Sequence, residues 1–485
     1  MNAPGNPGMN GRPTSYTASA ESLQQHPVPD WFLDAKFGIF IHWGPYSIPA
    51  FAPHHAQISE LSGSNASQTF ADVPYSEWYL NTMKFPDGAT AAFHRETYGE
   101  DYSYDHFGAA FNESLVNWDP VTWAKHFRRS GARYVVLVTK HHDGFLLWPS
   151  ATPNPHKPNW GTKRDVVGEL AAAARAEGLK FGVYYSGGID WTFKDNRINS
   201  FADVMAMPGE ADGYIDYANA HYNELIERYE PDYLWNDIGY PSQQASFDIL
   251  AKYYNSVPDG LTNDRWMAPD GAFSADAFEK PEGLNGIIPP KPPVWDTRTP
   301  EYGMFNRILP FLWETTRGMG HSFAFNRNET AEDYLSDDEI ASMLARAACF
   351  GGNVLLNVGP RGDAQLDPTQ ADRLAEVGGW VERSRSAFQD TRPVALSQET
   401  VGGVSIGATR RDETLYLHFF GEPGTNSVSI KLPESIGAVD SVTQMNGEVG
   451  TWSVSDDQLE FDVTSWADGP VKIVTLTLTG TEADA

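Results

Sequence analysis

The chain alternates between amphipathic helices and short apolar segments, and this alternation limits its possible folds more than any other feature. Asp119 and Pro120 supply the cap and first residue of one helix, and the apolar run 134–138 follows it. The same order of helix and apolar run recurs before residues 181–185 and 354–358. Repeated units of this kind predict a (β/α)8-like barrel, whose active site lies at the carboxyl ends of the strands. A doubly wound sheet is the alternative, but no glycine-rich dinucleotide fingerprint follows any strand.

The hydrophobic pattern divides the chain into three parts. Residues 1–25 are rich in Gly, Pro, Asn and Ser and are predicted to form a disordered leader. Residues 26–390 carry the helix-and-strand alternation of the predicted barrel. After residue 391 the apolar residues recur at every second position, which predicts a C-terminal antiparallel β-sandwich over residues 391–485. The expected class is therefore α/β with an added all-β domain.

Composition narrows the range of partners. Lys and Arg total 35 against 64 Asp and Glu, which gives a formal charge of −29. Such a surface repels phosphate backbones and anionic lipids, so nucleic acid and membranes are not expected partners. The single cysteine, Cys349, excludes an internal disulfide framework. With no visible signal peptide at the start, we expect a cytoplasmic location.

Polar side chains gather where the predicted barrel strands end. His42 follows the run 37–41, His141 and His142 follow the run 134–138, and Asp237 ends the Tyr-Leu-Trp run. Because parallel barrel strands end on the same rim, these side chains are expected to lie together as a functional site.

The histidines allow a metal-dependent hydrolase as one hypothesis. His42, His141 and His142 would be its ligands. Adjacent residues point to opposite faces of an ideal strand, so His141 and His142 are not expected to share a metal ion, and no HxH or HExxH spacing occurs. The spacing therefore predicts no metal ion at these histidines.

Asp237 ends a run of aromatic and apolar residues, so its carboxylate is expected to be half buried. Burial of a charge is costly and is seldom retained without a use. A nucleophilic or basic carboxylate is one use, and a structural ion pair with Arg265 is the other.

Several segments, in order along the barrel, resemble the α-L-fucosidases of glycoside hydrolase family 29. They are Lys36-Phe-Gly-Ile-Phe-Ile-His-Trp-Gly44, Glu77-Trp-Tyr79, Thr139-Lys-His-His-Asp-Gly-Phe145, Phe181-Gly-Val-Tyr-Tyr-Ser-Gly-Gly188, Leu234-Trp-Asn-Asp237, Asn263-Asp-Arg-Trp266 and Gly351-Gly-Asn-Val-Leu-Leu-Asn-Val-Gly-Pro360. The pair Lys140-His-His-Asp-Gly-Phe145 and Trp235-Asn-Asp237 is far more specific than a short motif match.

This resemblance implies a retaining exo-α-L-fucosidase that releases terminal α-L-fucose through a covalent glycosyl-enzyme, without a cofactor. It implies that Asp237 is the nucleophile. It also implies that a group of side chains lines the sugar pocket, namely His42, Glu77, Trp78, His141, His142, Tyr184 and Arg265. Trp78, Trp235 and Trp266 are candidates for the apolar wall that faces the methyl group of a 6-deoxy sugar, with ordinary core packing as the alternative for each.

The acid/base has two candidates. The segment Trp295-Asp-Thr-Arg-Thr-Pro-Glu-Tyr302 is similar to the family segment that carries this glutamate, which implies Glu301, and we expect it in a loop. The long proline-rich stretch between Arg265 and Trp295 departs from the family pattern, and Glu314 is the second candidate.

Other functions and properties stay open at this level. A non-catalytic fucose-binding protein would keep the pocket without the chemistry. The linkage preference, the aglycone, the balance of hydrolysis against transglycosylation and the formation of a homo-oligomer are not encoded in any motif we find.

Overall fold

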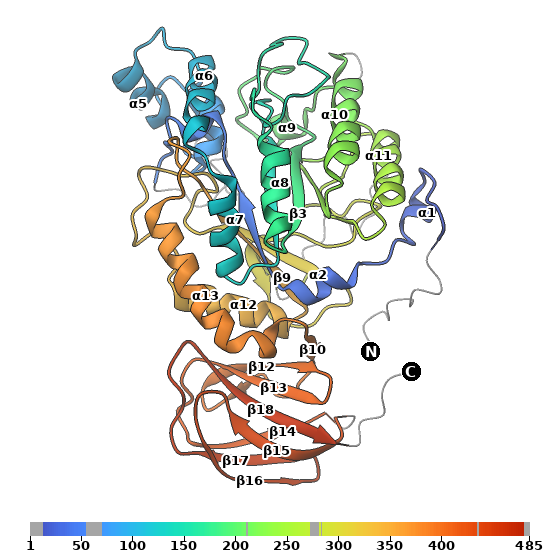
Figure 1. Ribbon diagram of the computed structural model, residues 1–485, viewed down its shortest axis with the longest axis vertical. Coiled ribbons are helices and arrows are strands. Elements are labelled where there is room, and N and C mark those ends of the chain that lie inside the picture. The colour runs from blue at the N-terminus through green and yellow to red at the C-terminus, as the bar shows by residue number, and fades with distance from the viewer. Residues whose placement is uncertain are drawn as a thin grey trace.

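The computed structural model places a barrel domain above a smaller β-sandwich (Figure 1). It describes residues 13–54, 70–209, 212–271, 281–282, 284–433 and 436–479. Among these residues, no helix is both long and apolar enough to cross a membrane.

The barrel is a curled sheet of nine strands in the order β5-β4-β3-β2-β1-β9-β8-β7-β6. Neighbouring strands run parallel throughout, except that β6 is antiparallel to β7. The strands are β1 (Phe37–Ile41), β2 (Tyr134–Lys140), β3 (Lys180–Ser186), β4 (Tyr233–Asp237), β5 (Leu261–Thr262), β6 (Leu284–Ile287), β7 (Glu301–Phe305), β8 (Trp313–Gly318) and β9 (Gly352–Val358). The predicted barrel-like architecture is confirmed.

Residues 296–299 lie between the two arms of the curled sheet. The Asp296 amide donates to the Thr262 carbonyl of β5 over 3.2 Å, and the Glu314 amide of β8 donates to the Arg298 carbonyl over 2.8 Å. This short segment therefore bridges β5 and β8 and completes the wall of the barrel.

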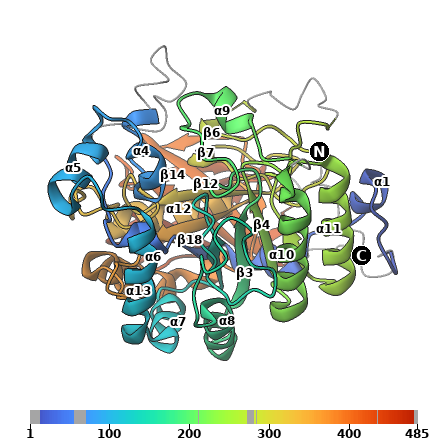
Figure 2. The same cartoon turned by 90° about the horizontal axis from the view of Figure 1, so that it is seen from above.

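Helices surround the barrel wall, as the view from above shows (Figure 2). They are α1 (Ala20–Leu23), α2 (Asp30–Ala35), α4 (Tyr79–Thr82), α5 (Ala89–Tyr98), α6 (Asp105–Ser114), α7 (Pro120–Arg129), α8 (Val166–Ala176), α9 (Phe201–Met205), α10 (Tyr214–Tyr229), α11 (Gln243–Ser256), α12 (Asp337–Cys349) and α13 (Pro368–Phe388), with 3-10 turns η2 (Pro45–Ser47), η4 (Ser76–Trp78) and η5 (Leu115–Asn117). In Figure 1, α5, α6 and α9 lie at the end of the barrel that faces away from the sandwich.

Polar side chains cap the starts of two barrel helices, and one of them is the predicted Asp119. Asp119 accepts a hydrogen bond from the Val121 amide at the start of α7, and Ser336 forms a capping box with Glu339 at the start of α12.

The interior of the barrel depends on a pairing of small and large residues. A side chain at Gly38 would lie 2.2 Å from the ring of Tyr134, so only glycine lets that ring enter the barrel.

The sandwich packs against the last two barrel helices. Its larger sheet has the order β10-β12-β13-β18-β15 with β11 paired to β12, and its smaller sheet has the order β14-β17-β16. Its strands are β10 (Arg392–Val394), β11 (Thr400–Val401), β12 (Val404–Arg411), β13 (Thr414–Phe420), β14 (Ser427–Lys431), β15 (Ala438–Gln444), β16 (Val449–Ser455), β17 (Gln458–Val463) and β18 (Val471–Thr479). Thr409 of β12 donates to the Ala387 carbonyl of α13 over 2.5 Å. The guanidinium of Arg346, from α12, lies 4.1 Å from the ring of Phe420.

Part of the predicted leader is packed against the barrel. Tyr16 is buried, and its backbone makes two 2.8 Å hydrogen bonds with the side chain of Asn255 on α11. Ser19 caps the short helix α1. The prediction of a disordered leader is therefore wrong for residues 13–25, because the apolar side chains of Tyr16 and Leu23 give this polar stretch an anchor; residues 1–12 lie outside the described part of the chain.

Candidate active site

Asp237 is the last residue of β4, and two donors hold its carboxylate. Tyr184 of β3 donates to Oδ2 over 2.7 Å, and Arg265 Nη1 donates to Oδ1 over 2.9 Å. Only 11% of the Asp237 side chain is exposed. Charge-assisted bonds to both oxygens fix the plane of the carboxylate, which can then meet an electrophile from one defined direction.

Arg265 also binds the predicted acid/base. Its Nη2 donates to Glu301 Oε2 over 3.0 Å, while its Nε donates to Thr299 Oγ1 over 3.2 Å. One guanidinium therefore bridges the carboxylates of Asp237 and Glu301. These two negative charges raise the pKa of Arg265 despite its burial, so it stays a cation.

The sequence suggested that Glu301 lies in a loop, but it is the first residue of β7. Its pairing with Thr316 of β8 extends the sheet to this point. Tyr75 donates to Glu301 Oε1 over 2.9 Å. Tyr75 was not among the predicted site residues. Its only signal was its position two residues before Glu77, in the same segment.

Glu314 lies at the other end of the barrel. It is the second residue of β8 and accepts hydrogen bonds from Tyr134 and Tyr233, the first residues of β2 and β4. Asp237 is the last residue of β4. Burial raises the pKa of Glu314 to about 8, so it is a protonated core group at the amino ends of the strands.

The predicted histidines gather beside Asp237. His42 follows β1, and its Nδ1 lies 2.6 Å from Asn357 Oδ1 of β9. The rings of His141 and His142 are 4.0 Å apart, and His142 Nδ1 lies 2.6 Å from Ser186 Oγ. The expectation that His141 and His142 point to opposite faces is wrong, because β2 ends at Lys140 and both residues lie in the turn beyond it.

Burial keeps these imidazoles neutral at physiological pH. It lowers the pKa of His42 to about 4 and that of His142 to about 3, and it lowers the pKa of His141 well below its usual value. A neutral imidazole offers both a donor and an acceptor, which suits the recognition of hydroxyl groups. His141 Nδ1 is buried and makes no hydrogen bond with the described protein groups.

Buried charges shape the turn that carries His141 and His142. Lys140 Nζ lies 2.8 Å from Asp190 Oδ2, with both side chains fully buried. Asp143 accepts a 2.8 Å hydrogen bond from Tyr104, and burial raises its pKa to about 6. These contacts explain why Lys140 and Asp143 flank the two histidines in the motif.

Glu77 and Trp78 come from the turn η4, in the connection after β1. Glu77 Oε2 accepts from the Ala324 amide over 3.0 Å, and burial together with the charge of Glu301 raises its pKa to about 7. The ring of Trp78 packs edge-on to that of His142 at 5.3 Å. Trp78 therefore joins the histidine group, and Glu77 lies close enough to Glu301 to feel its charge.

The two remaining tryptophan candidates are buried. Trp235 is 2% exposed, and the guanidinium of Arg265 lies over its ring at 4.7 Å from the ring centre, so Trp235 supports Arg265. Trp266 is 1% exposed, packs on Tyr222 and donates to Thr262 Oγ1 over 2.7 Å, which makes it a core residue. The structure thus brings together every predicted site residue except Glu314 and Trp266.

Comparison with known proteins decides the family. The alpha-L-fucosidase family profile matches residues 8–385. The chain belongs to the alpha-L-fucosidase family. It is accordingly an alpha-L-fucosidase of the glycoside hydrolase class, which sets aside the non-catalytic binding protein.

Individual relatives agree with this family. The tissue alpha-L-fucosidase of Mus musculus is 29% identical over 473 residues, covering 92% of this chain and 90% of the relative. The plasma alpha-L-fucosidase of Pongo abelii is 30% identical over 457 residues, covering 90% of this chain and 86% of the relative. The alpha-fucosidase of Thermotoga maritima in complex with a mechanism-based inhibitor has a TM-score of 0.79 and 35% identity, covering 95% of this chain and all of that structure.

Proposed function

We propose that this alpha-L-fucosidase releases terminal α-L-fucose with retention of configuration, with Asp237 as the nucleophile and Glu301 as the acid/base. The observation that carries the proposal is the Arg265 guanidinium, which binds both carboxylates at distances of 2.9 and 3.0 Å. Retaining glycosidases need two carboxyl groups close together across the anomeric carbon, one to attack and one to transfer a proton.

In the first step, an Asp237 oxygen attacks the anomeric carbon of fucose. The bond from that carbon to the leaving oxygen breaks as Glu301 donates its proton to that oxygen. The product is a fucosyl ester of Asp237, and Glu301 becomes a carboxylate. The bonds from Tyr184 and Arg265 hold the attacking group at a rigid strand end, which limits the reorganisation needed to reach the transition state.

In the second step, a water molecule attacks the same carbon while Glu301 removes a proton from that water. The ester bond breaks, Asp237 recovers its charge and fucose leaves. While the ester exists, Asp237 carries no negative charge. Glu301 is then the carboxylate partner of Arg265, so the bridging guanidinium stabilises whichever of the two groups is ionised.

Recognition of fucose is assigned to the side chains around Asp237. Glu77 and the neutral rings of His42, His141 and His142 supply donors and acceptors for the sugar hydroxyls. Trp78 supplies apolar surface for the methyl group and the C–H face of the ring.

Complexes of related proteins support this substrate class. The Thermotoga maritima alpha-fucosidase has been solved with fucose, at a TM-score of 0.79 and 34% identity. An alpha-L-fucosynthase from the same organism has been solved with alpha-L-Fuc-(1-2)-beta-L-Fuc-N3, at a TM-score of 0.81 and 35% identity. We extend the binding of fucosylated ligands to this chain.

A metal-dependent reaction at the histidines finds no support among the described residues. His42, His141 and His142 form no group whose ligand atoms converge there as a metal ion would require. His42 and His142 each have one ring nitrogen occupied by a protein partner.

The stereochemical outcome tests the proposal. Hydrolysis of an aryl α-L-fucoside is followed by proton NMR before mutarotation equilibrates the product. Retention predicts that α-L-fucose appears first and the β anomer later. The appearance of β-L-fucose first would show inversion and overturn the assigned roles of Asp237 and Glu301.

A further inference from the structure

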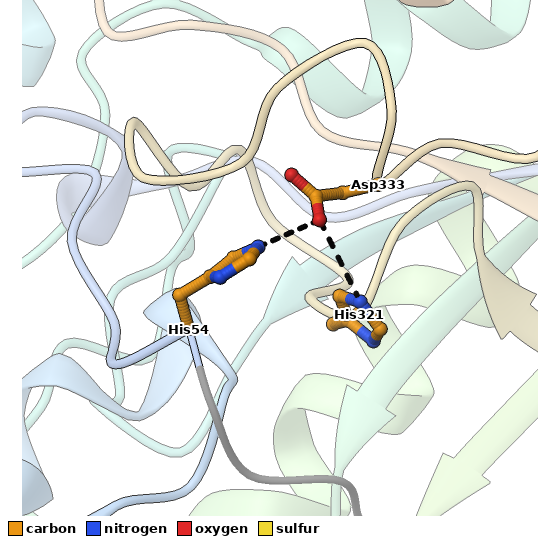
Figure 3. Close-up of side chains that lie close together, drawn as sticks. All are labelled: His54, His321 and Asp333. Carbon is orange, nitrogen blue, oxygen red and sulfur yellow. Dashed lines mark ion pairs between the residues drawn. The ribbon is translucent and has the colours of Figure 1, made fainter.

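A second group of convergent side chains lies outside the proposed catalytic residues. His54 belongs to the connection after β1, and His321 and Asp333 belong to the connection between β8 and α12. Figure 3 shows both imidazoles directed at one carboxylate oxygen. His54 Nε2 lies 2.7 Å from Asp333 Oδ1, and His321 Nε2 lies 4.0 Å from the same atom.

We propose that His54, His321 and Asp333 form a zinc site that ties these two connections together at the rim of the barrel. One ligand atom from each residue lies within 4.8 Å of the others. Two imidazoles and a carboxylate are a ligand set that Zn²⁺ accepts, at metal–ligand distances of about 2.0–2.2 Å. A small rotation of the side chains brings the three atoms around one ion.

The backbone around the group holds two of the ligands in place. Asp333 Oδ2 accepts from the Thr330 amide over 2.7 Å, which leaves Oδ1 directed at the histidines. The His321 amide donates to the half-buried carboxylate of Glu329 over 2.8 Å. Only His54 comes from a different part of the chain. A bound ion would therefore link His54 to His321 and Asp333, which the backbone already holds in place.

The group is open to solvent on one side. The side chains of His54 and His321 are 45% and 34% exposed, and that of Asp333 is 15% exposed. An ion can therefore enter from solution, and water can complete a tetrahedral shell as the fourth ligand. An exposed ion pair between His54 and Asp333 would contribute little to stability, whereas a bound metal ion would contribute its binding free energy.

The location suggests a structural role beside the active site. The His321 carbonyl accepts a 2.7 Å hydrogen bond from Tyr302, the residue after Glu301. The site therefore lies one hydrogen bond away from the segment that carries Glu301, and this hydrogen bond forms without the ion. The ion itself would not contact the reacting atoms, because its ligands are separate from Asp237, Arg265 and Glu301.

Metal binding can be measured directly. The full chain is stripped with a chelator and titrated with Zn²⁺ alone, by equilibrium dialysis with metal analysis and by thermal unfolding. We expect one Zn²⁺ per chain and a rise in Tm with zinc concentration. His54→Ala and Asp333→Asn should each weaken binding by more than about tenfold. His156→Ala is the matched control, because His156 is exposed and belongs to no such group among the described residues.

Two controls separate this site from the hydrolytic function. In the presence of chelator, His54→Ala should unfold at nearly the wild-type temperature, so its effect on Tm should appear only when zinc is added. Chelator-treated wild type should hydrolyse an aryl fucoside at an unchanged rate. The proposal is overturned if no saturable one-to-one binding is found, if both variants bind zinc as wild type does, or if the chelator abolishes hydrolysis.

Discussion

Tyr184 donates a 2.7 Å hydrogen bond to Oδ2 of Asp237, and both side chains end in the barrel interior near the carboxyl ends of neighbouring strands. The bond supports one oxygen of the proposed nucleophile while Arg265 supports the other. Burial and the charge of Asp237 raise the pKa of Tyr184 well above its usual value, so it acts as a donor throughout the active pH range.

Tyr184→Phe removes this donor and leaves the ring in place. A hydrogen bond to a charged group contributes about 1.5–3 kcal/mol, so we expect kcat/KM for an aryl fucoside to fall by roughly 10- to 150-fold. Tyr185→Phe is the matched control in the same strand, because its hydroxyl faces His221 and not Asp237. Equal activity of the two variants would contradict the role of Tyr184.

Arg265→Lys tests the guanidinium that bridges the two carboxylates. A lysine ammonium keeps the charge but cannot donate to Asp237 and Glu301 through a planar fork. We expect a fall in kcat of about 10²–10³-fold, the usual cost of losing a preorganised donor. Circular dichroism and thermal unfolding check that the variant remains folded. Near-normal kcat in a folded Arg265→Lys variant would show that the bridge is not needed.

Glu301→Gln should affect substrates according to their leaving groups. A nitrophenolate leaves without a proton, whereas a sugar alkoxide needs one, so the loss in the first step should be small for nitrophenyl fucoside and about 10²–10⁴-fold for a fucosylated oligosaccharide. The measurement is kcat/KM for both substrates, which reports the first step alone. An equal loss on the two substrates would assign proton transfer to another residue.

Glu314→Gln separates the two candidates for the acid/base and should leave kcat nearly unchanged on both substrates. It should also change the pH dependence of stability. The pKa of Glu314 is raised to about 8 in the folded protein, so the native state holds a proton that the unfolded chain releases above its ordinary pKa of 4.5. The contribution of Glu314 to the free energy of unfolding is therefore fully present below pH 4.5 and is lost as the pH rises to about 8.

Glutamine cannot titrate, so the Glu314→Gln variant should lose less unfolding free energy than wild type between pH 5 and pH 8. Urea denaturation at several pH values measures this difference. A steeper decline in the variant, or a loss of hydrolysis comparable with that of Glu301→Gln, would contradict the placement of Glu314 in the core.

The sequence predicted the barrel because its helix caps and apolar runs are local signals. Asp119 caps a helix where its side chain was expected to do so. The expectation that parallel barrel strands end on the same rim also placed His42, His141 and Asp237 together. Contacts between distant residues were harder to foresee. No local pattern joins Tyr75 to Glu301, or Asn357 to His42, since these pairs are separated by 226 and 315 residues.

Two predictions about strand ends were wrong. The directions of His141 and His142 were derived from an ideal strand, and Glu301 was expected in a loop. The chain ends β2 at Lys140 and begins β7 at Glu301, and these boundaries depend on pairing with other strands. Local sequence does not specify such pairing, so side-chain directions at strand ends could not be predicted from it.

Asp237→Gly with and without azide tests the assignment of the nucleophile most directly. Without azide, the variant should hydrolyse an aryl α-L-fucoside more than about 10³-fold more slowly than wild type, because no ester can form. Azide can enter the space left by the carboxylate and attack the anomeric carbon from the same face. We therefore predict restored turnover and a β-configured fucosyl azide product. Near wild-type activity without azide, or an α-configured azide product, would contradict Asp237 as the nucleophile.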